Sequence, residues 1–289
     1  MNPDATAIIP RWLEEQCIRL RDEGCNLRNL NLNIRRLTPA MIVELSKTLQ
    51  TNKRIQVVNM TSSLSSLTNH PAFASILLPL ACAIQYHTSL TTLHLSYNRL
   101  TNVQVLAVSL ARNQSSLLEL HLDHNHLNTD TALALAETIR CNQRLQVLQL
   151  NSNQIHDKGG AAIAVALKEN TSLRTLGMAR NRLGMNTAVA LLSALREKNV
   201  TLTRLMLCEN PDMPDTMVRT CLYLVQANAS GRYLLRNNDE NNTDSGTVNM
   251  NNDKGGLWPL VLEGLEPSMI FFFLVEKPSL VPSNAGDIR

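Results

Sequence analysis

The chain has 289 residues, of which 49 are leucine and only ten are phenylalanine, tryptophan or tyrosine. A core so rich in leucine and so poor in aromatic residues indicates many thin, similar layers rather than one central mass. A net charge of +3 with 18% charged residues excludes a polyelectrolyte, so charge alone implies no nucleic-acid partner.

The N-terminal segment, residues 1–26, is expected to form a capping helix. Its opening, MNPDATAIIPRW, lacks the basic start and the apolar stretch of a secretory signal. The helix is predicted from about Arg11 to Glu23, and Gly24 would end it. Its apolar face holds Trp12, Leu13, Cys17 and Leu20. Such a helix would cover one open end of the domain that follows.

Residues 27–212 repeat the pattern L-x-x-L-x-L-x-x-N-x-L. The units start at Leu27, Ile55, Leu90, Leu117, Leu145, Leu173 and Leu202. The first half of each unit alternates apolar and polar residues, as a strand does, and the second half has apolar residues at helical spacing. Each unit is therefore predicted to be a strand, a turn and a helix, and stacking the units would bury a continuous core.

This pattern resembles the leucine-rich repeat family, and in particular its ribonuclease-inhibitor-like class. The resemblance implies an α/β fold, a right-handed leucine-rich repeat solenoid or horseshoe. It would hold about seven 28-residue strand–helix repeats with helical caps, with the parallel strands on the concave face and the helices outside.

Asparagines recur at two positions of the repeat. Those in the pattern itself are expected to satisfy backbone groups where the chain leaves each strand. The asparagines that follow the helices, such as Asn52, Asn113 and Asn142, are expected to end them in the left-handed conformation. Both predicted roles are structural.

The second unit and the C-terminal end depart from the repeat. The second unit is longer than the modal 28 residues, and its surplus, Thr61 to Phe73, is expected to form a surface loop, with a part of the binding face as the alternative. Residues 213–236 are predicted to be a C-terminal cap with a helix from Asp215 to about Ala227. We expect an Asn-rich disordered linker at 237–256 and a helical tail at 257–289, whose apolar run is too short to span a membrane.

Catalytic and cofactor motifs are missing from the sequence. There is no phosphate-binding loop, nucleophile elbow, zinc-protease motif or C-x-x-C pair, so we expect no enzyme, no cofactor and no metal. His94, His121 and Asp123 would lie close enough on adjacent strands to share a divalent metal, but a solvated polar surface is the expected role. The six scattered cysteines indicate a reducing compartment, cytoplasmic with the nucleus not excluded.

The exposed strand positions carry mixed polar residues, which suit a protein partner rather than nucleic acid. The sequence therefore favours a non-enzymatic protein–protein interaction scaffold, without a membrane span, that binds a partner of unknown identity on its concave face. An alternative is a regulator of a small GTPase, because activators acting on Ran resemble this repeat class, although their acidic tail has no counterpart here. A third is a structural array subunit. The expected contact residues are His94, Tyr97, Arg99, His121, Asp123, His124 and His126.

Overall fold

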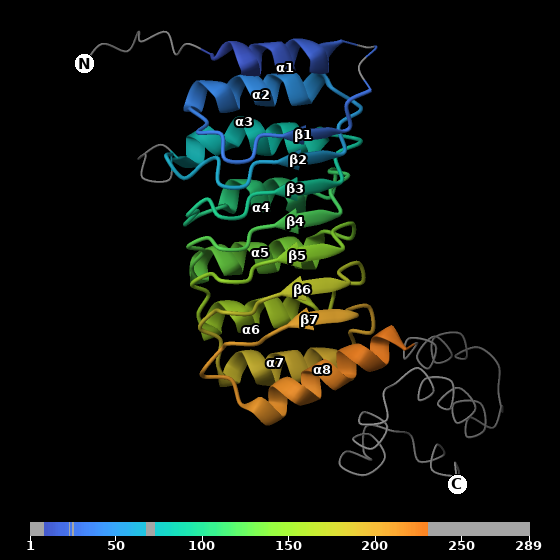
Figure 1. Cartoon of the computed structure of the whole chain (residues 1–289). Helices are drawn as coiled ribbons and strands as arrows, with labels where there is room; N and C mark the ends of the chain where they lie inside the picture. The colour runs from blue at the N-terminus through green and yellow to red at the C-terminus, as the bar shows by residue number, and fades with distance from the viewer. Residues whose placement is uncertain (1–8, 23, 25, 68–72, 231–289) are drawn as a thin grey trace, which may run out of the picture.

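A computed structural model of the chain describes residues 9–22, 24, 26–67 and 73–230. The predicted Asn-rich linker at 237–256, the tail at 257–289 and the end of the predicted C-terminal cap lie outside these residues. The described chain is a single stack of strand–helix units (Figure 1).

Seven short parallel strands form one sheet in sequence order. They are β1 Asn29–Asn31, β2 Val57–Asn59, β3 Thr92–His94, β4 Glu119–His121, β5 Val147–Gln149, β6 Thr175–Gly177 and β7 Arg204–Met206. The helices lie behind the sheet on one side (Figure 1). They are α1 Arg11–Arg21, α2 Pro39–Thr51, α3 Phe73–Tyr86, α4 Gln104–Ala111, α5 Thr129–Cys141, α6 Asp157–Ala166, α7 Met185–Glu197 and α8 Asp215–Ala229. The predicted solenoid of seven repeats is confirmed.

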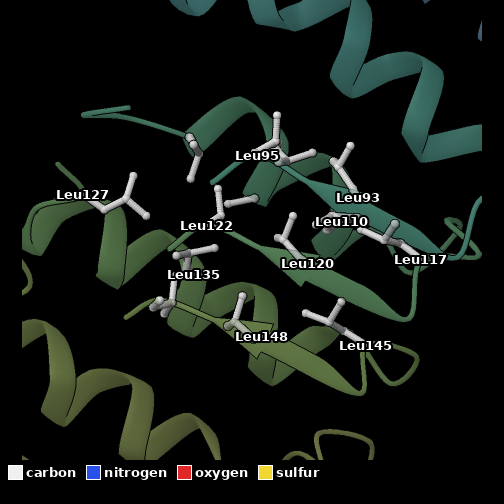
Figure 2. Packing of buried hydrophobic residues seen from close by; sticks show 14 of the residues in the cluster. Leu93, Leu95, Leu110, Leu117, Leu120, Leu122, Leu127, Leu135, Leu145 and Leu148 are labelled. Carbon is white, nitrogen blue, oxygen red and sulfur yellow. The ribbon is translucent and has the colours of Figure 1, made fainter. Parts of the chain in front are cut away.

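The core is a layer of leucines between the sheet and the helices. The middle residue of each strand is buried, as Leu93, Leu120 and Leu148 illustrate (Figure 2). Because the strands pair in register, these leucines stack directly on one another from repeat to repeat. No single repeat could bury its own apolar face, so neighbouring repeats stabilise each other.

The two ends of the stack are covered by helices. Helix α1 buries Leu13, Cys17 and Leu20 against the first repeat. It ends at Arg21, before the expected stop at Gly24. Helix α8 closes the other end with Cys221 among its buried residues. No helix in the described part of the chain combines the length and apolar character that crossing a membrane requires.

A row of buried asparagines ties each repeat to the one before it. Asn125 donates to the Leu95 carbonyl at 3.1 Å, and its Oδ1 accepts from the N–H groups of Asn98 and Leu100, both at 3.0 Å. The same exchange is made by the whole row, Asn98, Asn125, Asn153, Asn181 and Asn210. The structural role predicted for these residues is confirmed.

The asparagines after the helices behave differently from the prediction. Only Asn113 is left-handed, with φ of 56°, whereas Asn52 and Asn142 are extended. The Asn142 side chain accepts from the N–H of Leu145 at 2.8 Å and donates to the Leu110 carbonyl of the preceding repeat at 2.7 Å. A side chain that satisfies both ends of the turn makes a left-handed cap unnecessary. This second row contains Asn52, Asn142, Asn170 and Asn199.

The insertion in the second repeat is not a wholly exposed loop. Residues 61–67 are described, and Leu64 and Leu67 point into the core, with 0% and 6% of their surface exposed. Ser63 occupies the position of the first asparagine row and donates to the Leu32 carbonyl at 2.6 Å. The described half of the insertion is therefore packed against the repeats.

We predict that Leu122→Asp or Leu150→Asp strongly destabilises the stack. Both leucines have no exposed surface, so the carboxylate would be buried without a partner. The free energy of unfolding should fall by several kcal/mol, on the order of 4. Urea unfolding measures this loss, and Thr175→Asp, on the open face, is the control. An unchanged unfolding curve for either leucine variant would contradict the repeat register.

His87 takes an asparagine's place in the second row and fills it incompletely. Its Nδ1 accepts from the Leu90 N–H at 3.0 Å, while its buried Nε2 has no hydrogen-bond partner among the described residues. Burial lowers the pKa of His87 below its ordinary value of 6.5. The unfolded chain therefore binds more protons, and stability present above about pH 6.5 is lost as the pH falls below it.

We predict that His87→Asn stabilises the protein by about 1 kcal/mol at pH 7.5, because the amide can supply both the acceptor and a paired donor. It should also reduce the loss of stability between about pH 7.5 and pH 5.5. These two values lie about one unit above and below the pKa of a free histidine, which is about 6.5. Urea unfolding at the two pH values measures both effects. The exposed His156, changed to Gln, is the control, and a variant less stable than the native chain at pH 7.5 would refute the assignment.

Candidate protein-binding surface

The first and third residues of each strand lie on the open face of the sheet and are at least partly exposed, except Gly177, which is buried. The pairing of the strands aligns one row as Asn29, Val57, Thr92, Glu119, Val147, Thr175 and Arg204. It aligns a second row as Asn31, Asn59, His94, His121, Gln149, Gly177 and Met206. Both rows are those that the sequence predicts. They mix polar and small apolar residues, and neither forms a stripe of one charge.

Two histidines of the second row stack on each other. The ring centroids of His94 and His121 are 4.4 Å apart, and their planes differ by 24°. Nε2 of His121 lies 3.5 Å from the Glu119 carboxylate. Burial and then the adjacent His121 lower the pKa of His94, against the opposing effect of Glu119 and Asp123. His94 therefore stays neutral to a lower pH than a free histidine.

Asp123 belongs to the framework of the next turn. Its Oδ1 accepts from the backbone N–H of Asn151 at 2.9 Å and from the Asn151 side-chain amide at 2.8 Å. Asn151 in turn accepts from the Ala179 N–H at 2.9 Å. Over the residues that the structure describes, no group of three or more His, Cys, Asp or Glu is arranged to hold a metal ion. Asp123 therefore serves mainly to order the edge of the open face.

A row of left-handed residues lies where the chain turns away from each strand. Each immediately precedes the position of the first asparagine row, with φ between 53° and 61°. The row is Ile34, Ser62, Tyr97, His124, Ser152, Arg180 and Glu209. None is glycine, so each repeat accepts backbone strain on the order of 1 kcal/mol and keeps a side chain there. The row is partly exposed, with Tyr97 at 52%.

Neighbours in the left-handed row pair with each other. The Tyr97 and His124 rings stack, with centroids 4.2 Å apart and planes 10° from parallel. Two repeats further along, Arg180 donates to the Glu209 carboxylate at 2.8 Å. These contacts hold long side chains in place at the turn, which lowers the entropy that a partner must overcome on binding.

Beside this row the surface forms an open hollow of about 560 Å³, which we call the turn hollow. Its lining residues come from the turns after β1, β2, β3 and β4. They are Arg36, Ser62, Ser65, Ser66, Tyr97, Arg99, His124 and His126. The Gln154 side-chain amide lies 3.0 Å from Nδ1 of His126 and steadies that ring.

The structure divides the seven predicted contact residues into two groups. His94, His121 and Asp123 lie on or beside the open face, and Tyr97, Arg99, His124 and His126 line the turn hollow. Sequence reasoning missed Arg36 and the three serines of the hollow. The length of the second repeat was the available signal, because it marks the insertion that supplies Ser65 and Ser66.

Two segments of the chain, residues 86–108 and 141–164, match the family model described as Leucine Rich repeat. Each segment runs from the end of one helix through a strand into the next helix, which is one repeat of the observed stack. The chain is a leucine-rich repeat protein. A search of curated proteins found no match to its sequence.

Three solved structures similar to this leucine-rich repeat protein illustrate how distant its relatives are. Actin-binding site 2 of leiomodin-1 is 17% identical, with a TM-score of 0.34, over 80% of this chain and 99% of that one. The tropomodulin C-terminal domain of Caenorhabditis elegans is 15% identical, with a TM-score of 0.35, over 79% and 99%. An internalin of Listeria monocytogenes is 17% identical, with a TM-score of 0.36, over 68% and 65%. Likenesses this distant assign no partner.

We predict that the neighbours of His94 control its pKa. His121→Gln should raise the pKa of His94 because it removes a neighbouring group that disfavours the charged form. Glu119→Gln should lower it because it removes a negative charge that favours that form. NMR titration of the His94 ring protons measures both shifts. A His94 titration that moves in neither variant would contradict the stacked geometry.

Proposed function

We propose that this leucine-rich repeat protein is a non-enzymatic scaffold that binds a protein partner through its open strand face and the adjoining turns. The observation that carries the proposal is the Tyr97–His124 stack beside Arg99, ordered by the fold and still exposed. Tyrosine and arginine are enriched at the energetic centres of protein interfaces. The backbone at these residues is held in the strained left-handed conformation, yet their side chains lie outside the core.

The arrangement of the layers supports the same face. The helices lie behind the sheet, so the two aligned strand rows are left open in the described structure (Figure 1). Seven strands at about 4.8 Å give a width of about 30 Å, enough for a contact of standard size. Polar side chains of moderate length, such as His94 and Gln149, suit the mixed surface of a protein partner.

The proposal includes the class and the compartment of the protein. A helix of 8 to 14 residues in every full repeat supports the ribonuclease-inhibitor-like class. The five described cysteines are free thiols, which supports a reducing compartment, the cytoplasm or the nucleus. Neither the described residues nor the comparisons supply an observation that favours a GTPase regulator.

We predict that Tyr97→Ala combined with Arg99→Ala strongly weakens binding of the partner. Proximity labelling with the full chain and mass spectrometry first identifies the proteins that it meets, and direct binding to the recovered partner is then measured. Loss of the aromatic ring and the guanidinium should weaken binding by at least about tenfold. Thermal unfolding should stay unchanged, because neither side chain is buried in the core.

The matched control is Tyr86→Ala combined with Arg112→Ala. Both residues are exposed, and both lie at ends of helices in the layer behind the sheet. This variant should bind the partner as the native chain does. Full binding by the Tyr97/Arg99 variant, or equal losses in the two variants, would move the interface away from the turn hollow.

A further inference from the structure

The turn hollow has a specific cause in the repeat geometry. Arg36, Arg99 and His126 occupy the same repeat position, directly after the first asparagine row or its equivalent. In the second repeat that position is Leu64, which turns inward and is fully buried. Its backbone N–H is held by the Asn98 side chain at 2.7 Å. The row of long side chains is therefore interrupted between Arg36 and Arg99, and the hollow lies in the gap.

The walls of the hollow are cationic, and short hydroxyls line it as well. The lining consists of two arginines, two histidines, three serines and Tyr97, and no acidic residue is among the lining residues. Arginine and serine side chains can donate hydrogen bonds to an anion, and a histidine can donate from its protonated nitrogen. The site therefore has donors on several sides and no fixed negative charge to oppose an anionic ligand.

The two arginines are not used inside the described structure. Arg180, in the left-handed row of another turn, is paired with Glu209 at 2.8 Å, and Arg35 lies over the Trp12 ring at 4.8 Å. Arg36 and Arg99, by contrast, form no ion pair and no side-chain hydrogen bond with another described residue. They start two strands apart, about 10 Å, a span over which two arginine side chains can converge on one group.

We propose that the turn hollow binds a phosphate monoester carried on a side chain of the protein partner. A phosphoserine, phosphothreonine or phosphotyrosine carries close to two negative charges and three acceptor oxygens, which match the donors of two arginines and of the serines in the lining. At about 560 Å³ the hollow exceeds a phosphate group alone, which leaves room for the residue that carries it. The Tyr97 ring supplies an aromatic wall for that residue. This inference rests on the proposed protein-binding function.

The direct test titrates the full chain with N-acetyl-phosphoserine amide and with inorganic phosphate, followed by NMR of the backbone amides. Phosphoserine should shift the signals of Ser62, Ser65 and Arg99. Arg36→Gln or Arg99→Gln should each weaken the binding of phosphoserine by about tenfold. Arg112→Gln, an exposed arginine in the helix layer, should leave binding unchanged. Unshifted signals in the native chain, or equal losses in all three variants, would overturn the proposal.

Two further measurements separate this inference from the proposed function. If dephosphorylated partner still binds at native strength and needs Tyr97 and Arg99, the interface stands and the phosphate inference fails. If the partner does not use the open face while phosphoserine still binds in the hollow, the proposed interface fails and the phosphate site remains.

A third titration uses a phosphodiester, the dinucleotide UpU. Binding as tight as that of phosphoserine would make the hollow a nucleic-acid contact and overturn the assignment to a protein partner.

Discussion

The asparagine side chain that closes each turn is the interaction on which the stack depends. A repeat leaves backbone donors and acceptors unpaired where the chain departs from the strand, and burial would make them costly. The side-chain amide of Asn125, for example, donates to a carbonyl of the preceding repeat and accepts from a backbone N–H in the turn of that repeat. It therefore satisfies both a donor and an acceptor at the junction. The second row, to which Asn142 belongs, does the same where the chain leaves the helices. The leucine core between these two rows can then stack in constant register.

This framework separates the positions that hold the fold from those that can vary. The asparagine positions and the strand leucines are buried and nearly invariant from repeat to repeat. The left-handed position before each position of the first asparagine row holds an isoleucine, a serine, a tyrosine, a histidine, an arginine or a glutamate in different repeats. The backbone therefore presents a different side chain at the same place in each turn. Recognition can change along this row without disturbing the core, which is how repeat proteins acquire distinct binding surfaces on one scaffold.

Particular residues show where sequence reasoning succeeded and where it failed. The strand rows follow from the period alone, because each repeat contributes one residue at each position and parallel strands pair in register. The asparagines after the helices were assigned a left-handed backbone from their general tolerance for it, and at Asn52 and Asn142 that was wrong. Their side chains bond to the preceding repeat, a contact between residues about thirty positions apart that no local preference reveals. Asn199, which follows the last repeat helix α7, makes the same kind of bond to the Leu167 carbonyl.

The sequence by itself determined the number of repeats, the strand register, the core leucines and the structural asparagines, because all of these are periodic and period is a local chemical pattern. Only the tertiary structure decided which turn residues meet. Arg36 and Arg99 come to flank one hollow because Leu64, between them in the stack, is drawn into the core and its own repeat contributes only short serines. That outcome depends on how one irregular insertion packs against its neighbours, and packing against neighbours is a property of the assembled solenoid rather than of any single repeat.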